Sequence, residues 1–520
     1  MARYYIRWLQ YLKRNHQHLN SPNASFEAVP QLARVIPRDS HPISRSGISP
    51  DALRVLYRLR DAGYQAFLVG GCVRDLMLGN EPKDFDVATN ALPEDVRRLF
   101  RNCRLIGRRF RLAHVFFGRD IIEVATFRAA SAPEPGDEPM LDLEGEGEGE
   151  GEGEGDDGEA VDAAPAAQFD EPDVDRVVNE QGRILRDNVY GTIDQDVWRR
   201  DFTVNALYYN IADFSIWDYV GGFEDVMARR LRLIGDPETR YREDPVRMLR
   251  AARFEAKLGL ELDHATSAPV AELRQLLASV PSARLFDETL KLFLTGHGAR
   301  SYQVLKARGL LEVLLPSVAR VVSRYPGGPV ERLLVAGLEN TDARVRNDRP
   351  VTPTFLFALL LYGPVAVEIE SAPRDRWQDT GTILDAVDSA IRGIYSRVAL
   401  PRRFALGVRD MFALQPRLEA PRGRRALRLL ENPKFRAAFD LLALRAQCGM
   451  ADPAIVEWWE KLQKAGPQQL ASLAEGAEGG WPDGGSDDAA APASSGEGGP
   501  GRPRRRRRPR AGRGPRPARG

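Results

Sequence analysis

Cysteine is scarce in this chain of 520 residues, and long apolar runs are missing from it. The three cysteines, Cys72, Cys103 and Cys448, lie far apart without CxxC or Cys/His spacing, which excludes a disulfide framework and a structural zinc site. The longest apolar run, 355–362, precedes a Gly-Pro pair that is expected to end it well short of a membrane span. The N-terminus lacks the apolar stretch and cleavage site of a signal peptide. We therefore expect a soluble, cytoplasmic protein with no membrane insertion.

Net charge is also nearly absent, because 74 Lys and Arg balance 73 Asp and Glu to give +1. The balance hides two segregated stretches: residues 134–180 hold 19 acidic residues and one basic residue, whereas residues 502–519 hold ten arginines and no acid. The acidic stretch contains a Glu-Gly repeat without apolar residues to bury, which predicts disorder. The second stretch is typical of a tail that binds phosphate backbones. Its candidate RNA-binding residues are Arg504, Arg505, Arg506, Arg507 and Arg508.

Composition and apolar periodicity place the chain in the α+β class and divide it into five parts. Helical periodicity dominates from Asp187 to about Leu462, which predicts that this region is all-helical. The five parts are a flexible N-terminal extension (1–48), a small α/β domain (49–210) with a disordered acidic insert (131–181), a first helical domain (211–275), a helical body (276–465) and a disordered arginine-rich tail (466–520).

Turn residues and periodicity also predict the elements of the α/β domain. Ser49-Pro50-Asp51 supplies a cap and a first-turn proline for a helix that Gly63 ends. The remaining expected elements are a strand at 66–69, a short helix after a Gly-Gly pair, strands at 84–88, 112–117 and 121–127, and a helix at 93–100.

Two patterns in this domain carry chemistry. Asp84 and Asp86 are two residues apart on an expected strand, so their carboxylates share one face and can hold divalent ions between them. Gly70 and Gly71 stand at a strand-to-helix turn, where a phosphate chain can approach backbone N–H groups, and Arg74 follows in the helix. Taken singly, an Asp-x-Asp pattern is more often a solvated turn and a Gly-Gly pair is only a turn. Together and in this order, they indicate a nucleotide and a metal.

A third acid, Glu123, interrupts an otherwise apolar strand, where an unpaired carboxylate is costly to bury and a cation would compensate it. Three carboxylates on neighbouring strands suit two Mg²⁺ ions, of which one activates an attacking hydroxyl and the other stabilises the leaving phosphate. We therefore predict nucleotidyl transfer, with Asp84, Asp86 and Glu123 as metal ligands.

A further cluster lies at residues 198–207, which follow a helical pattern. This pattern places Asp201 and Asn205 four residues apart on one face, with Arg200 beside them. A carboxylate, an amide and a guanidinium can engage the ribose hydroxyls and phosphate oxygens of a nucleotide. The alternative is a salt-bridge cluster on the protein surface.

Asp244 and Arg247 form the last candidate pair, three residues apart at an expected helix start. One acceptor and one forked donor can read the edge of adenine, with Asp244 accepting from the exocyclic amine and Arg247 donating to a ring nitrogen. The alternative is a helix cap with a local ion pair.

In this order, the motifs resemble the class II nucleotidyltransferase superfamily, which contains the bacterial poly(A) polymerases and the tRNA CCA-adding enzymes. The resemblance covers roughly residues 49–130 and 185–444 and rests on the GG-x-VRD, Asp-x-Asp, RRDFT-x-NA and EDPVRMLRAARF elements. It implies that the α/β domain is a catalytic head and that the first helical domain is a neck that recognises the base. It also implies that Asp84 and Asp86 bind catalytic magnesium and that Asp201 belongs to the active site.

Within that superfamily, the sequence LIGRRFRLAHV at 105–115 resembles the signature that separates poly(A) polymerases from CCA-adding enzymes. Residues 432–445 and the arginine-rich tail also resemble poly(A) polymerases. The resemblance implies addition of AMP from ATP to RNA 3′ ends with two Mg²⁺ ions, by a monomer that works with RNA-decay proteins. The alternatives are a CCA-adding enzyme and an RNA-binding scaffold that has lost catalysis.

Overall fold

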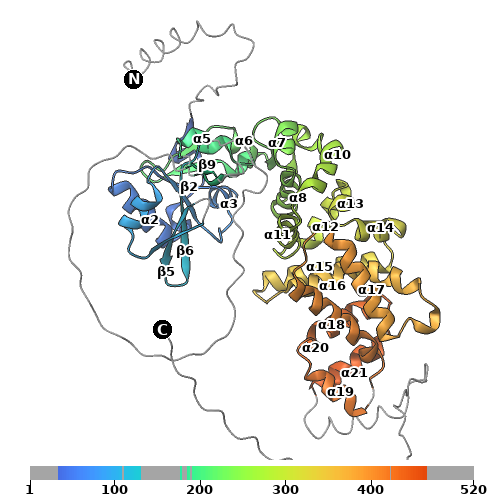
Figure 1. Ribbon diagram of the computed structural model, residues 1–520. Coiled ribbons are helices and arrows are strands. Elements are labelled where there is room, and N and C mark those ends of the chain that lie inside the picture. Colours follow the sequence, from blue (N-terminus) through green and yellow to red (C-terminus); the bar gives the residue numbers. More distant parts are fainter. Residues whose placement is uncertain are drawn as a thin grey trace, which may run out of the picture.

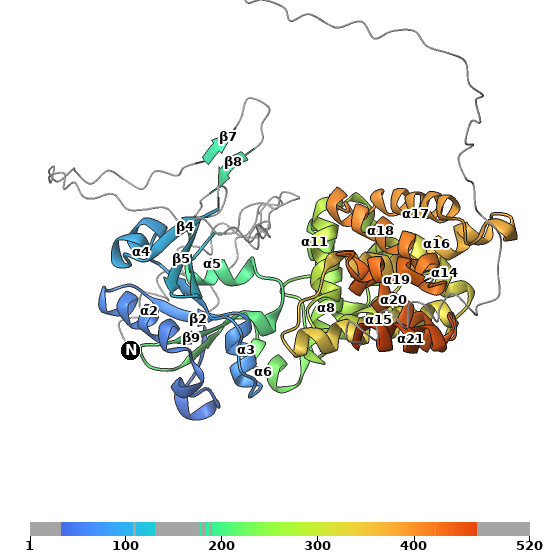
Figure 2. The ribbon, with the colours of Figure 1, turned by 90° about the horizontal axis from the view of Figure 1, so that it is seen from below.

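The computed structural model of the chain describes residues 33–107, 111–129, 176–178, 184–187, 190–421 and 423–464. Figure 1 shows a head built around a sheet and a helical body, with the helices α7 (Pro237–Glu243), α8 (Val246–Leu258) and α11 (Ser282–Phe293) between them. Figure 2 shows the same separation in a view turned by 90°. The predicted α+β class is confirmed. The expected tail and nearly all of the expected acidic insert lie outside the described residues.

The head sheet contains eight strands in the order β1-β10-β9-β2-β3-β6-β5-β4. β3 and β6 pair in parallel, and the other neighbours pair antiparallel. The strand bounds are β1 Arg34–Ile36, β2 Ala66–Val69, β3 Asp86–Thr89, β4 Cys103–Ile106, β5 Leu112–Phe117, β6 Asp120–Thr126, β9 Leu207–Asn210 and β10 Ile216–Asp218. A separate antiparallel pair consists of β7 (Arg176–Val178) and β8 (Ile184–Asp187).

Different parts of the chain cover the two faces of the sheet. Helices α2 (Pro50–Asp61) and α4 (Pro93–Leu99) cover one face, where Leu56 and Val96 share a core with Leu68 of β2. On the other face, Phe67 and Tyr208 pack with Val197 of α5 (Ile193–Trp198). Because successive side chains of a strand alternate, the wholly apolar β2 is buried on both faces.

The head begins earlier and ends later than the sequence predicts. β1 pairs with β10, and Ile36, Ile43 and Ile48 are buried in the core. Residues 34–48 are therefore part of the head rather than of a loosely held extension. The prediction of an all-helical region from Asp187 onward is wrong at its start, because β9 and β10 complete the sheet. A four-residue apolar run fits a strand and a helical turn equally well, so pairing with β2 decides its conformation.

A short, mainly helical neck follows the head and joins it to the body. It contains α6 (Gly222–Met227), α7, α8, α9 (His264–Ser267), α10 (Val270–Leu273) and the parallel pair β11 (Arg230–Leu231) and β12 (Glu261–Leu262). Phe254 of α8 packs edge to face on Phe202 of the head, with ring centroids 5.5 Å apart. Since α8 also packs on α11 and α12 of the body, this one helix contacts both lobes.

The body is built from α-helices from α11 onward. After α11 they are α12 Gly298–Ala307, α13 Leu311–Leu314, α14 Pro316–Arg324, α15 Pro329–Arg346, α16 Pro353–Glu370, α17 Thr380–Tyr395, α18 Arg402–Glu419, α19 Gly423–Leu430, α20 Phe435–Gln447 and α21 Pro453–Lys464. Short 3₁₀ turns complete the described elements: η1 Arg38–Ser40, η2 Arg45–Gly47, η3 Thr203–Asn205, η4 Arg274–Ser279 and η5 Arg374–Arg376.

Helix α16 corrects the expectation that its apolar run ends at a Gly-Pro pair. The helix continues through Pro364 to Glu370, and Gly363 permits close packing against Val321 and Val330. By length and composition, α16 is the one helix among the described residues that is apolar enough to cross a membrane. Its most apolar stretch is 56% buried inside the protein, as in the core helix of a soluble protein.

Candidate active site

The turn between β2 and α3 (Gly71–Met77) lies at the centre of the site. Gly70 has a φ of 81°, which residues with side chains rarely adopt. A Cβ on Gly70 would lie 3.7 Å from Asp86 Oδ2 and 3.9 Å from Arg200 Nη1. The structure therefore places three predicted site residues, Gly70, Asp86 and Arg200, side by side. Gly71 opens α3, and Arg74 lies in the same short helix.

Two of the expected carboxylates meet on adjacent strands. Asp86 is the first residue of β3 and is in register with Glu123 of β6, so both side chains project from the same face. His114 of β5 continues this row, with its Nε2 3.6 Å from Glu123 Oε1. The strand expected at 84–88 begins two residues later, so Asp84 lies in the preceding loop. The alternation of strand side chains thus does not position Asp84.

The three carboxylates form a region of uncompensated negative charge. Loss of solvation, followed by the charges of Glu123 and Asp84, raises the pKa of Asp86 to about 6, although Arg200 acts in the opposite direction. Loss of solvation and then Asp84 raise the pKa of Glu123. Burial lowers the pKa of His114, so its neutral ring offers Glu123 no counter-charge near neutral pH. A bound cation would lower the cost of ionising these acids.

The carboxylates fit a magnesium ion that a nucleotide helps to bind. In the part of the chain that the structure describes, no group of three or more His, Cys, Asp or Glu side chains is arranged to hold a metal. Mg²⁺ commonly takes one or two protein carboxylates and completes its octahedral shell with water and substrate phosphates. Asp86 and Glu123, with Asp84 close enough to raise both pKa values, provide such oxygen ligands.

Arg200 is held by a buried acid that the sequence analysis did not single out. Asp196 accepts hydrogen bonds from Arg199 Nε at 2.9 Å, Arg200 Nη2 at 3.0 Å and Tyr208 Oη at 2.6 Å. Burial acts to raise the pKa of Asp196, but the two guanidinium groups hold it well below its usual range. Arg200 is therefore not part of a surface salt-bridge cluster. The i,i+4 spacing of Asp196 and Arg200 was the sequence signal for this pair.

The segment after α5 does not continue as the expected helix. α5 ends at Trp198, and residues 201–203 extend along residues 232–234 with two backbone hydrogen bonds of 2.9 and 3.0 Å. This pairing buries Phe202, which a continuous helix would direct elsewhere. Asp201 and Asn205 nevertheless meet, because η3 folds the chain back and leaves Asn205 Nδ2 3.5 Å from Asp201 Oδ1.

Asp201 connects the head to α8 of the neck. Arg250 donates to Asp201 Oδ2 from Nε at 2.9 Å and from Nη2 at 2.6 Å, and the backbone N–H of Phe202 donates to Oδ1 at 2.7 Å. Burial acts to raise the pKa of Asp201, but Arg250 lowers it. Asn205 is linked in turn to Arg74 of α3. Asp201 thus lies at the joint between head and neck, with both oxygens engaged by protein donors.

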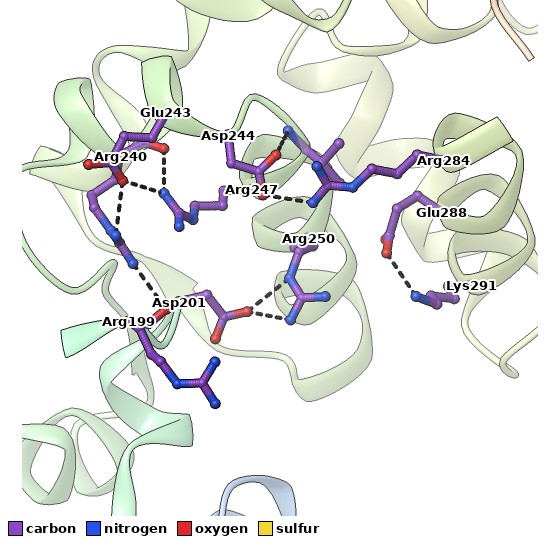
Figure 3. A network of polar contacts seen from close by, with 11 residues as sticks. Arg199, Asp201, Arg240, Glu243, Asp244, Arg247, Arg250, Arg284, Glu288 and Lys291 are labelled. Carbon is purple, nitrogen blue, oxygen red and sulfur yellow. Dashed lines mark hydrogen bonds and ion pairs between the residues drawn. The ribbon is translucent and has the colours of Figure 1, made fainter. Parts of the chain in front are cut away.

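The expected base-reading pair lies where α7 meets α8, and Figure 3 shows it within a network of charged side chains. Asp244 accepts from Arg284 Nη2 of α11 at 2.8 Å and from the backbone N–H of Val246 at 3.2 Å. Arg247 Nη1 donates to Glu243 Oε2 at 2.9 Å. The helix cap considered as an alternative is therefore present. Within the described residues, however, no ion pair joins Asp244 to Arg247.

The sequence analysis did not single out Arg250 and Arg253 of α8, which lie with Arg74 of the head around the ring of Phe254. The guanidinium groups of Arg74, Arg250 and Arg253 lie 5.9, 5.9 and 4.9 Å from the ring centroid of Phe254. Burial and then the charge of Arg74 lower the pKa of Lys257, one turn further along α8. Arg250, Arg253 and Lys257 follow one another at intervals of three and four residues along α8, and this spacing was the sequence signal that could have identified them. This concentration of positive charge suits an anionic ligand.

The predicted RNA-binding arginines Arg504, Arg505, Arg506, Arg507 and Arg508 lie outside the described residues, as do residues 108–110 of the LIGRRFRLAHV segment.

Comparison with protein families agrees with this geometry. A family model described as "Poly A polymerase head domain" matches residues 66–232, which include the carboxylates, the Gly-Gly turn and Asp201. A second, "Probable RNA and SrmB-binding site of polymerase A", matches residues 259–321. A third, "Polymerase A arginine-rich C-terminus", matches residues 376–511.

Comparison with individual proteins decides between the two branches of the superfamily. The chain is 45% identical to a poly(A) polymerase I of Escherichia coli O6:H1 over 85% of its own length and 88% of that protein. The chain belongs to the poly(A) polymerase I family. A CCA-adding enzyme of Bacillus velezensis is 31% identical over only 51% of the chain and 55% of that protein, so CCA-adding enzymes are a related family. Members of the poly(A) polymerase I family are nucleotidyltransferases, as the sequence motifs predict.

A solved structure titled "tRNA-processing enzyme (apo form 2)" shares the fold. It is 19% identical, with a TM-score of 0.50, and the match covers 81% of this chain and 99% of that one. At this identity the likeness concerns the fold alone.

Proposed function

We propose that the protein is a template-independent polynucleotide adenylyltransferase that extends RNA 3′ ends with AMP from ATP. The RNA 3′-hydroxyl oxygen bonds to the α-phosphorus of ATP, the bond to the β-phosphate oxygen breaks, and pyrophosphate leaves. One observation supports the proposal: the Asp201–Arg250 pair attaches the head segment that follows Arg200 to α8, the helix that also carries the proposed base reader Arg247. Phosphate chemistry and base recognition thereby belong to one site.

Asp84, Asp86 and Glu123 would hold two Mg²⁺ ions in this site. Bound there, the ions would lower the pKa of the 3′-hydroxyl and neutralise the charge of the leaving pyrophosphate. The chain's own contribution is to hold acidic oxygens together where, within the described residues, none of the ion pairs with Lys or Arg involves them. These are the oxygen ligands that Mg²⁺ prefers.

The triphosphate would lie against the Gly70-Gly71 turn and the positive charges of the cleft. Gly70 lies beside Asp86 and Arg200 with a positive φ that a residue with a side chain would adopt only under strain. Arg74 and Arg200 supply guanidinium donors for phosphate oxygens. We assign Asp201 to positioning rather than to contact with the reacting atoms, since its oxygens hold α8 in place through Arg250.

Asp244 and Arg247 would read the adenine of ATP, with Asn205 and Arg200 near its sugar and phosphates. The pattern of donor and acceptor alone does not select adenine, because cytosine also presents an exocyclic amine beside a ring nitrogen acceptor. Selection must therefore come from the larger size of the purine, which requires that both readers stay fixed. Arg284 fixes Asp244 and Glu243 fixes Arg247, and neither contact uses all of the lone pairs or N–H groups of the reader.

RNA 3′ ends and ATP are the substrates in this proposal. The arginine-rich tail would bind the RNA backbone, and proteins of RNA decay would be partners of a monomeric, cytoplasmic enzyme. The sequence-indifferent attraction between arginines and phosphates suits a growing single strand.

Primer extension tests the proposed function directly. A short single-stranded RNA is incubated with Mg²⁺ and with ATP, CTP, GTP or UTP in separate reactions, beside an Asp84→Ala variant. A long ladder with ATP that the variant does not produce supports the proposal. Addition limited to two C and one A on a trimmed tRNA would assign the chain to CCA addition, and no extension would leave an RNA-binding scaffold.

A further inference from the structure

A second cavity lies behind the catalytic segment, between the head and α9. Its volume is about 550 Å³, which is within the range of small-molecule sites. The side chains that define its chemistry are the aromatic Trp198 and Tyr219, the cation Arg232 and the acid Asp263. Leu233 and Ile234, both buried, form part of its apolar wall.

This cavity is separate from the proposed catalytic cleft. None of the residues assigned above to metal, phosphate or base binding lines it. The two sites share only a wall, the segment 198–203. Trp198 and Thr203 at the ends of this segment line the cavity, whereas Arg200 and Asp201 between them turn to Asp196 and Arg250.

The two aromatic side chains in the cavity carry polar groups that are available to hydrogen-bond a ligand. Within the described residues, neither the Trp198 indole N–H nor the Tyr219 hydroxyl has a hydrogen-bond partner. Burial, and then the charge of Asp194, raises the pKa of Tyr219 to about 12, so its hydroxyl remains a donor near neutral pH. Tyrosine and tryptophan rings are the surfaces on which nucleobases stack.

The two charged side chains are held in place and keep free binding capacity. Arg232 donates from Nε to Asp225 at 2.8 Å and from Nη2 to the carbonyl of Val220 at 3.0 Å, which leaves its Nη1 group available. Asp263 caps α9 through Oδ2, which accepts from the N–H of Ala265 at 3.1 Å, and its Oδ1 is not engaged by the cap. A fixed guanidinium suits a phosphate, and a carboxylate oxygen suits an exocyclic amine.

We infer that this cavity binds an adenine nucleotide at a site distinct from the catalytic cleft. The base contacts Trp198 and Tyr219, its exocyclic amine donates to Asp263, and its phosphate approaches Arg232. The nucleotide is either free in solution or an unpaired residue of the RNA, since both present the same groups. A ligand here contacts the reverse side of the segment that carries Arg200 and Asp201.

Photocrosslinking with two probes tests the inference on the full chain. One probe is 8-azidoadenosine 5′-monophosphate, and the other is an oligo(A) RNA that carries 8-azidoadenine. We expect label on Trp198 or Tyr219 themselves, located by fragmentation of the labelled tryptic peptides, and at least a fivefold loss of that label in Tyr219→Leu. Label from the RNA probe alone identifies RNA as the source, and label from the mononucleotide identifies a free nucleotide as a ligand.

Three controls separate the result from folding and from catalysis and test the role of the exocyclic amine. Asp263→Ser retains a capping oxygen for α9 but withdraws the acceptor, so it should lower the label if Tyr219→Leu does not fold. In the wild type, inosine monophosphate, which lacks the exocyclic amine, should compete severalfold more weakly than AMP. Asp84→Ala should keep the cavity label even though it loses extension. Label confined to residues of the catalytic cleft would overturn the inference. So would label that is unchanged in both Tyr219→Leu and Asp263→Ser.

Discussion

The head and the neck of this protein treat charge in opposite ways. In the head, Asp84, Asp86 and Glu123 lie together with no Lys or Arg paired to them in the part of the chain that the structure describes, and the pKa of Asp86 rises to about 6. In the neck, every acid of the α7–α8 junction is bound by an arginine, as Figure 3 shows for Asp244 and Arg284. The head therefore carries carboxylates whose charge a cation would compensate, whereas the neck holds Asp244 and Arg247 in place through its own ion pairs.

Removing a head carboxylate should give the largest effect on activity. Asp84→Ala or Asp86→Ala should lower the rate of RNA extension by roughly a thousandfold or more, because the metal-dependent step loses an oxygen ligand. The measurement is primer extension with ATP, alongside RNA binding, which should remain nearly unchanged. Asp120→Ala is the matched control, because this exposed acid lies on β6 with Glu123 but outside the row of carboxylates. Extension at a normal rate in either variant would contradict the assignment.

Breaking the contact between the head and the neck should cause the largest loss of stability. Asp201→Ala removes the carboxylate that accepts two hydrogen bonds from Arg250 in a mostly buried position, which should lower the free energy of unfolding by about 3 kcal/mol. Urea unfolding of Asp201→Ala, Arg250→Ala and the double variant measures the coupling, and the two losses should be clearly less than additive. Arg242→Ala is the control, since its pair with Glu238 is more than half exposed and contributes little. Additive losses would mean that the pair does not join head and neck.

Freeing Asp244 from Arg284 should change the preference for ATP over CTP more than it changes the rate of extension. Arg284→Ala releases one oxygen of Asp244, so the reader can shift toward a smaller base. The ratio of kcat/KM for ATP over CTP should fall about tenfold, or roughly 1–2 kcal/mol. Arg436→Ala, an exposed arginine on α20, should leave the ratio unchanged. If Arg284→Ala lowers both rates equally, Arg284 serves stability rather than recognition.

Neutralising one head carboxylate should have the smallest effect on stability and show whether Mg²⁺ binds at these acids. Without Mg²⁺, Asp86→Asn should melt at the same temperature as the wild type or slightly higher, because it relieves repulsion among the carboxylates. Millimolar Mg²⁺ should raise the melting temperature of the wild type by about a few degrees and that of the variant less. Equal shifts in both proteins would place the Mg²⁺ elsewhere.

Much of the head was predictable because its elements are encoded by neighbouring residues. The cap at Ser49 and the helix that it begins were predicted, and so was the strand 66–69. The Asp-x-Asp spacing drew attention to Asp84 and Asp86, although Asp84 lies in the loop before β3 rather than on the strand. The same local reasoning extended the strand at 84–88 too far and continued a helix through Asp201, because nothing local distinguishes a helix from a segment that pairs with residues 232–234.

The sequence by itself determined the order of motifs, and with it the family, the Gly-Gly turn and the acids beside it. Only the tertiary structure decided which charges are compensated. Asp201 finds Arg250 at a distance of 49 residues in the chain, and Asp244 finds Arg284 at a distance of 40. No periodic pattern relates such partners, because the packing of α8 and α11 brings them together. The same packing pairs Asp201 and the acids of the α7–α8 junction with arginines, whereas Asp86 and Glu123 of the head face each other across two strands.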